Sequence, residues 1–205
     1  MKKAFFITFL FLVSNLTKAQ NISYGPTIGY SFYEIGNNNG RNQFVTDKNK
    51  TINFGAYLEY QFTDNLGLKT ELIFNKKEAY YRSLSFSIPQ DKFNFSFVEI
   101  NPNVKYDFGK EYRRGFYMLL GPKISFLTKV ILDNEDVKDD FETFIYGAQL
   151  GFGYRVFNFI DLQTKIEYDI APFIKFENDR KSQFFGANIS LNLDLERLIN
   201  SNWDF

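Results

Sequence analysis

The feature that most constrains the fold is an alternation of apolar and polar side chains over Phe144–Ile170. Every second residue of Phe144–Val156 is apolar or aromatic, and one face of Ile160–Ile170 is almost entirely apolar while the other is charged or polar. A period of two is typical of a β-strand, because successive side chains point to opposite faces. Only Phe157–Phe159 separate the two runs, so we expect a hairpin. Each run is long enough to cross a bilayer, which takes about 9–11 residues of tilted strand. The segment therefore predicts a transmembrane β-hairpin.

The same alternation recurs along the rest of the chain and predicts eight strands. They cover about residues 22–34, 52–62, 66–75, 98–108, 116–127, 144–156, 160–170 and 185–193. Their connections alternate long and short, which is the layout of an outer-membrane barrel with short periplasmic turns and longer extracellular loops. We expect an all-β, eight-stranded antiparallel up-and-down transmembrane β-barrel. With an even number of strands, both termini lie in the periplasm.

Two irregularities interrupt this pattern. The aromatic residues of Phe93–Phe97 alternate in the opposite phase to the strand that follows. This predicts either a β-bulge near Phe97–Val98 or an extension of the strand above the membrane. Proline also lacks the N–H that a strand interior needs, so we expect local bulges at the three prolines on the apolar faces. These are Pro26, Pro102 and Pro122.

The composition excludes several classes of function. The chain has no Cys and no His, which removes disulfides, thiolate metal sites, the usual general base and a Ser-His-Asp triad. Its formal net charge is zero, whereas a nucleic-acid binder needs a basic face. We therefore expect no enzymatic activity, no cofactor and no nucleic-acid partner. Aromatic residues make up 20% of the chain, which suits a barrel with aromatic girdles.

The first segment has the features of a secretory signal peptide. Lys2 and Lys3 precede an apolar run, Ala4–Val13, that is too short for a membrane-spanning helix. Small residues before the expected cleavage point place the end of the signal at Ala19. We expect residues 1–19 to be removed, and a buried N-terminal helix is the alternative.

The mature protein is then a single domain of residues 20–205. Its strands lie within about residues 22–195, and a short periplasmic tail follows over 196–205. The C-terminal Phe205 resembles the signal read by barrel-insertion machinery, and a short helix over Glu196–Asn200 is equally compatible with the tail. The expected location is the cell outer membrane.

The alternation alone does not say which face is outside, since a lipocalin-like soluble barrel alternates too. The apolar face is nearly free of charge, and a charge facing lipid costs about 2–4 kcal/mol at the midplane. The polar face carries many small residues and charges of both signs, which suits a narrow, filled polar lumen. We therefore expect the apolar face to contact lipid.

The charges on the polar face are expected to pair across the lumen and close it, because a buried unpaired charge is costly. The alternative is an ion path or a catalytic carboxylate pair such as Glu59/Glu71 or Glu167/Asp169. We favour a structural network. Its expected members are Glu59, Lys69, Glu71, Glu99, Lys105, Lys123, Arg155, Asp161, Lys165, Glu167 and Asp169.

An acidic segment in the third long loop, residues 133–142, is a second candidate site. Carboxylate oxygens are ligands that calcium prefers, but the segment lacks the glycine and terminal glutamate of an EF-hand loop. We interpret it as a solvated acidic loop and leave cation binding open.

Several segments together resemble the PorT-like family of outer-membrane β-barrels of the Bacteroidota. They are GPTIGYSF, VEINPNVKYDF, GFYMLLGPKISF and YGAQLGFGYRVFNFIDLQTKIEYDI, and they lie within residues 20–195. Where the family has an E-I-P run, this chain has Glu99-Ile100-Asn101-Pro102, which is one residue longer and leaves the local register open.

The resemblance implies a small barrel held in outer-membrane lipid, inserted by the barrel-insertion machinery, with envelope or secretion-complex proteins as partners. The family's founding member takes part in a secretion and gliding apparatus. The function we favour is a non-enzymatic structural, scaffolding or surface-interaction role. The alternatives are an outer-membrane enzyme and a soluble ligand-binding barrel.

Overall fold

The structure is a computed structural model that describes residues 22–37, 44–46, 50–81, 91–109, 113–173 and 182–200. The expected signal peptide, residues 1–19, and the end of the tail with Phe205 lie outside these residues. None of the described helices is long and apolar enough to cross a membrane.

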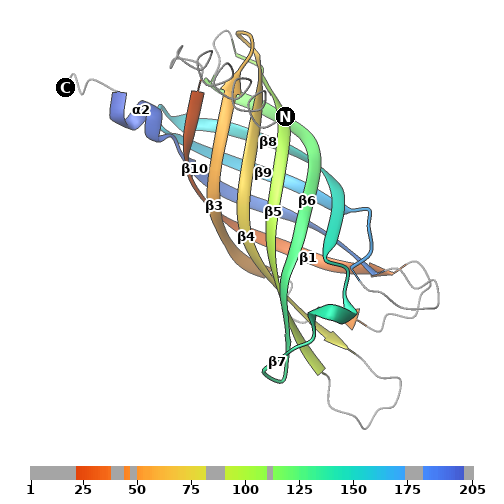
Figure 1. The fold of residues 1–205 in the computed structure, drawn as a ribbon. Helices are drawn as coiled ribbons and strands as arrows, with labels where there is room; N and C mark the ends of the chain where they lie inside the picture. Colours follow the sequence, from red (N-terminus) through yellow and green to blue (C-terminus); the bar gives the residue numbers. More distant parts are fainter. Residues whose placement is uncertain are drawn as a thin grey trace, which may run out of the picture.

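Eight long strands form a closed antiparallel barrel, as the alternation predicts (Figure 1). Each strand pairs with its neighbour along the chain, and β10 pairs with β1 to close the ring. The strands are β1 (Ile22–Asn37), β3 (Lys50–Gln61), β4 (Leu66–Tyr81), β5 (Asp91–Asp107), β6 (Phe116–Leu132), β8 (Phe144–Phe157), β9 (Ile160–Asp169) and β10 (Ser182–Leu193).

Four short elements border the barrel. The two-residue strand β2 (Phe44–Val45) pairs with β4, and β7 (Glu135–Asp136) pairs with β6. A single 3-10 turn, Lys138–Asp140, follows β7, and the helix α2 (Leu195–Asn200) follows β10. A short helix was one of the two interpretations of the C-terminal tail.

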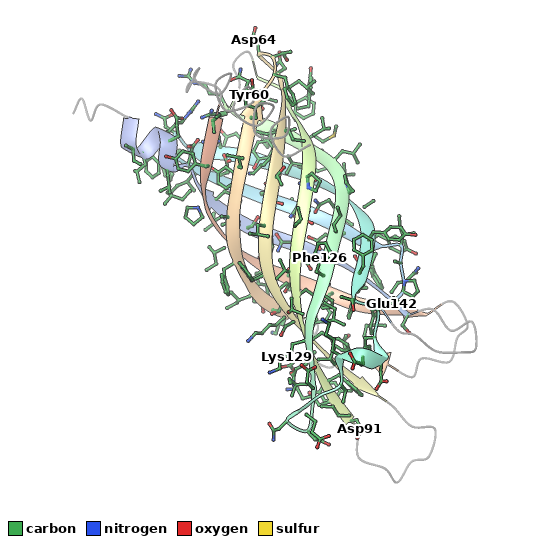
Figure 2. All side chains as sticks on the ribbon, viewed as in Figure 1. Tyr60, Asp64, Asp91, Phe126, Lys129 and Glu142 are labelled. Atoms are coloured by element: carbon green, nitrogen blue, oxygen red, sulfur yellow. The ribbon has the colours of Figure 1, made fainter. Side chains whose placement is uncertain are left out.

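The two ends of the barrel differ. The connections β3–β4, β5–β6 and β8–β9 are short and lie at one end, which we call the turn end; α2 is also there. The opposite end, the loop end, carries the longer connections and β7. In Figure 2, Asp64 marks the turn end, and Asp91 and Glu142 mark the loop end.

At the loop end, β4, β5 and β6 are longer than the sequence pattern predicts. β5 runs without interruption through Phe97–Val98, and Phe95, Phe97 and Glu99 all face the interior. The strand extension is therefore confirmed. The β5–β6 pairing also shifts its register between Ser96 and Phe97, next to the predicted bulge. The register shift lies on β6, where Thr128 is an extra residue between the partners of Ser96 and Phe97. The hydrophobic pattern changes phase because the interior itself changes from charged to aromatic.

The bulges predicted at the prolines are wrong. Pairing passes through Pro26 opposite Ala56 and through Pro102 opposite Thr70 with no change of register. The unbroken β4–β5 register also means that the extra residue before Pro102 is accommodated without a bulge. The β5–β6 pairing is interrupted between Ile100 and Val104, with the same register on both sides, and that register sets Pro102 opposite Pro122. The two missing N–H groups thus coincide at one place.

The outer surface of the barrel is apolar along every strand (Figure 2). This is the lipid-facing sense and the opposite of a lipocalin-like barrel, whose apolar side chains line the interior. Exposed large side chains include Ile28, Phe54, Leu72, Val104, Leu120, Phe152, Ile166 and Leu191. The polar side chains between them point into the lumen, which is therefore the place to look for a functional site.

Candidate functional site in the charged lumen

The described part of the lumen buries seven basic and seven acidic side chains. All eleven charges expected on the inner face point into the lumen, and ten of them are buried, while the side chain of Glu167 is 12% exposed. The basic members are Lys69, Lys77, Lys105, Arg113, Lys123, Arg155 and Lys165; the acidic members are Glu59, Glu71, Glu99, Asp107, Asp161, Asp169 and Asp194. Lys77, Asp107, Arg113 and Asp194 were not in the predicted set.

Two arginines organise the turn end of the lumen. Arg155 contacts Asp161 on the neighbouring strand through both carboxylate oxygens, and its Nη1 donates to Asp194 Oδ2 at 2.9 Å. Arg113, in the β5–β6 turn, lies 3.6 Å from the same Asp194 oxygen and donates to Glu196 Oε2 at 2.9 Å. Asp194 therefore joins the two arginines where β10 ends.

The helix α2 lies at the rim of this end of the barrel (Figure 1). The backbone N–H of Arg197 donates to Asp194 Oδ1 at 3.2 Å, and the helix packs against β1. Burial lowers the pKa of the Arg197 guanidinium below its ordinary value, and the nearby cations Arg155 and Arg113 lower it further. Arginine nevertheless stays protonated in proteins, so this end of the lumen keeps its positive charges.

Lys105 contacts two carboxylates and an aromatic ring inside the lumen. Its Nζ lies 2.8 Å from Glu59 Oε1 and 3.3 Å from Asp107 Oδ2. The same Nζ lies 4.5 Å from the centre of the Tyr117 ring. Tyr117 fits only because Gly153 on the adjacent strand has no side chain, since a Cβ there would lie 2.1 Å from the tyrosine ring.

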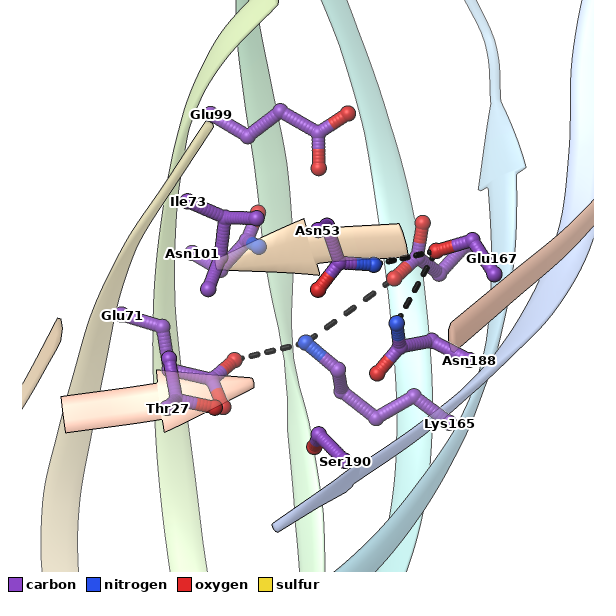
Figure 3. A pocket seen from close by; sticks show the side chains of 11 residues that line it. Thr27, Asn53, Glu71, Ile73, Glu99, Asn101, Lys165, Glu167, Asn188 and Ser190 are labelled. Atoms are coloured by element: carbon purple, nitrogen blue, oxygen red, sulfur yellow. Dashed lines mark hydrogen bonds and ion pairs between the residues drawn. The ribbon is translucent and has the colours of Figure 1, made fainter. Parts of the chain in front are cut away.

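A glutamine links the charges in the middle of the lumen. Gln163 accepts from Lys69 Nζ at 3.0 Å and donates to Glu71 Oε1 at 2.7 Å. Glu71 Oε2 in turn lies 2.6 Å from Lys165 Nζ, and Lys165 is 3.8 Å from Glu167. Figure 3 shows Lys165 reaching between these two carboxylates. Members from opposite walls of the barrel are thus held in one continuous network.

Lys123 is the central cation of the loop-end half. Its Nζ lies 3.1 Å from both Glu167 and Asp169 and 3.8 Å from Glu99. Glu99 is also 4.0 Å from Lys77. One lysine therefore faces three carboxylates in a region shielded from water.

Beyond Lys77, toward the loop end, the interior becomes aromatic. The Nζ of Lys77 lies 4.4 Å from the Phe184 ring centre, and Phe184 stacks on Phe173 at 4.3 Å. Phe95 is completely buried among these rings and contacts Phe141 at a centroid distance of 5.1 Å. We call this group the aromatic cap. Its members are Tyr33, Ile35, Ala79, Phe95, Phe97, Leu127, Val130, Phe141, Ile145, Phe173 and Phe184.

Among the described residues, the charged part of the lumen is filled rather than hollow. Two hollows between the charged side chains have volumes of about 10 Å³ each. This is about the space that one water needs, whereas ligand pockets are typically about 300–1,000 Å³.

The two candidate catalytic pairs are held by lysines. Glu59 contacts Lys105, Glu71 contacts Lys165, and Glu167 and Asp169 both contact Lys123. Carboxylates paired with buried cations favour the ionised form. Within the described residues, the hollow beside Glu71 and Glu167 has a volume of only about 10 Å³, too small for a substrate.

The acidic segment of residues 133–142 folds back on the end of β6. The Asp136 carboxylate accepts from the backbone N–H groups of Val130 and Lys138 at 3.3 and 3.2 Å. Phe141, within the same segment, belongs to the aromatic cap. Across the described ranges, no three acidic side chains are grouped in a way that could hold a metal ion.

A family model described as the outer membrane protein beta-barrel domain matches residues 18–175. The chain belongs to this family. The apolar belt of this outer-membrane barrel thus contacts membrane lipid. No curated protein sequence matches it.

Solved structures share the fold of this outer-membrane barrel at low sequence identity. Ail, the attachment invasion locus protein of Yersinia pestis, matches with a TM-score of 0.50 and 12% identity, over 85% of this chain and 99% of that chain. Ail in complex with the heparin analogue sucrose octasulfate matches with a TM-score of 0.51 and 13% identity, over the same shares. The outer membrane protein OprG from Pseudomonas aeruginosa matches with a TM-score of 0.48 and 12% identity, over 84% of this chain and 91% of that chain.

Proposed function

We propose that the protein is a sealed, non-enzymatic outer-membrane barrel that anchors and presents its loop end at the cell surface. The observation that carries this proposal is the filled lumen, in which balanced buried charges pair across the barrel beneath an aromatic cap. In this role the charge network is structural: it pairs the inward charges across the lumen and closes the barrel to ions.

An open pore or an active site would need a path or a pocket through this network. Moving Lys123 aside to open a path would remove the cation that three carboxylates share. Such a rearrangement is unfavourable because an uncompensated buried charge is costly. The pairing therefore supports an anchor over a channel or an enzyme.

The proposed orientation has the turn end and both termini in the periplasm. Short turns lie on the periplasmic side in barrels of this kind, and the β10–α2 end of the chain is at the turn end. A cleaved signal peptide over residues 1–19 and a mature domain over 20–205, with its tail at 196–205, complete the proposal. The loop end, with β7 and the extensions of β4, β5 and β6, is then the part exposed to other cells and molecules.

Single-cysteine labelling tests this orientation cleanly, because the chain has no native cysteine. Glu135→Cys, exposed on β7, is expected to react with a membrane-impermeant maleimide in intact cells. Asp64→Cys, exposed in the β3–β4 turn, is the matched control and is expected to react only after the outer membrane is permeabilised. The reverse pattern would contradict the orientation.

The resemblance to the PorT-like family supports a narrower proposal, a link to a secretion or gliding apparatus and its envelope proteins. A deletion strain carrying either the full gene or a variant lacking residues 82–90 tests it. A link of this kind predicts a defect in secretion or motility that the full gene restores. A deletion strain with normal secretion and motility would reject the link and leave the sealed anchor standing.

A further inference from the structure

The outer face of the barrel changes from apolar to basic at one sector of the loop end. On β3 and β4, the first outward side chains beyond the apolar belt are Lys50 and Lys76, and on β6 Lys129 is exposed just beyond Phe126. The equivalent position on β5 is Ser96. We call Lys50, Lys76 and Lys129 the basic notch; Figure 2 labels Lys129 on its strand.

The three lysines of the basic notch surround one hollow in the barrel wall. β3 and β4 pair only as far as Phe54 and Phe74, and beyond these residues the two strands separate while each stays paired on its other side. A cavity of about 510 Å³ lies there, and all three notch lysines line it.

The backbone also places Lys129 on this surface. Strict alternation along β6 would turn Lys129 into the lumen, because its inward residues up to Leu127 have odd numbers. The extra residue Thr128 shifts the register, so that Lys129 is exposed and Val130 is buried in the aromatic cap. As a result, Lys76, Ser96 and Lys129 lie side by side across three strands.

The charges of the notch have no acidic partner among the described residues. Glu78 lines the same cavity, but its carboxylate lies 3.1 Å from Lys92. Within the described ranges, none of the notch lysines forms an ion pair. On β1, which pairs with β3, the outward residue after Phe32, the partner of Lys50, is the acidic Glu34. The basic notch therefore ends at the β1 side of β3.

We propose that the basic notch binds the phosphate of a membrane-lipid headgroup in the leaflet that adjoins the loop end. Lysine is a common phosphate ligand, acting as a point charge. The cavity lies on the loop-end side of exposed apolar residues, including the stacked pair Phe54–Phe74. Acyl chains can pack against these residues. This position at the edge of the apolar belt favours a lipid phosphate over a soluble anion.

Native mass spectrometry of the purified barrel in detergent, with equal amounts of dioleoyl phosphatidic acid and dioleoyl phosphatidylcholine, tests the proposal. The wild-type protein is expected to retain phosphatidic acid in preference. Lys76→Gln/Lys129→Gln is expected to lose about tenfold of that preference, because each basic residue near a lipid surface contributes separately. The control Arg114→Gln/Lys138→Gln removes the same charge outside the notch and is expected to bind like wild type. Only folded protein, identified by its heat-modifiable migration on a gel, is compared.

Three results would overturn the proposal. One is equal retention of the two lipids by the wild-type protein, and another is the same loss of preference in both double variants. The third is displacement of phosphatidic acid by an equal concentration of inorganic phosphate, which would make the notch a site for free anions instead. None of these results depends on which end of the barrel faces the cell exterior.

Discussion

Lys123→Met is expected to lower the free energy of unfolding by about 3–5 kcal/mol, the range seen when one partner of a buried ion pair is removed. Methionine fills a similar volume, so the loss comes from charge rather than packing. The substitution leaves Glu167, Asp169 and Glu99 close together without their shared cation. Urea unfolding in lipid vesicles, followed by the migration of folded and unfolded protein on a gel, measures the change.

Two companion variants separate the charge effect from other causes. Lys138→Met, in the 3-10 turn outside the lumen, is expected to change stability by less than about 0.5 kcal/mol, as surface substitutions usually do. Adding Glu167→Gln to Lys123→Met removes one of the stranded negative charges and is expected to restore part of the loss. A Lys123→Met protein as stable as wild type would show that the lumen charges do not depend on one another.

The second large effect is expected at the aromatic cap. Phe95→Ala should lower the free energy of unfolding by about 3–5 kcal/mol, because it opens a cavity in a packed apolar cluster. Phe95 is fully buried, and its ring contacts those of Phe93, Phe97, Phe141 and Phe184. The same unfolding measurement applies.

A graded pair of variants makes the packing argument specific. Phe95→Leu keeps most of the side-chain volume and is expected to cost less than about 1.5 kcal/mol. If Phe95→Ala and Phe95→Leu lost equal stability, the cap would be held together by something other than packing. A loss below about 1 kcal/mol in Phe95→Ala would mean that the cluster collapses around the smaller side chain.

The barrel was predictable because its information is local and repeated. A period of two over eight segments identifies both the strands and the face of each residue, as Glu71 and Lys165 illustrate. The prediction that the apolar faces contact lipid followed from the near absence of charge on them. These patterns need no knowledge of which strands meet across the lumen.

The ends of the strands were harder to predict. Lys77 lies beyond the predicted end of its strand, and Arg113 lies in a turn, so neither was assigned to the inner face. Asp107 and Asp194 lie on the polar faces of their predicted strands, but they were not counted among the pairing charges. Arg113 and Asp194 are buried together at the turn end, where Arg113 and Arg155 both pair with Asp194. Lys77 is buried under the aromatic cap instead.

The aromatic cap was missed for a related reason. Phe141 lies in a segment interpreted as an acidic loop, and Phe173 lies in a connection without alternation. Phe95 could be assigned to the inner face only once the strand extension was known. It alternates in phase with the polar, inward residues of β5 and not with the apolar belt. The useful signal in the sequence was therefore the change of phase itself, which marks the depth at which the interior stops being polar.

The most direct test of the sealed barrel is its ion conductance in a planar lipid bilayer. The filled lumen, with its paired charges and aromatic cap, predicts no stepwise current above that of the bare bilayer when folded wild-type protein is inserted. A large and stable open state, seen in repeated single-protein insertions, would contradict the sealed barrel and indicate an open ion path through the lumen.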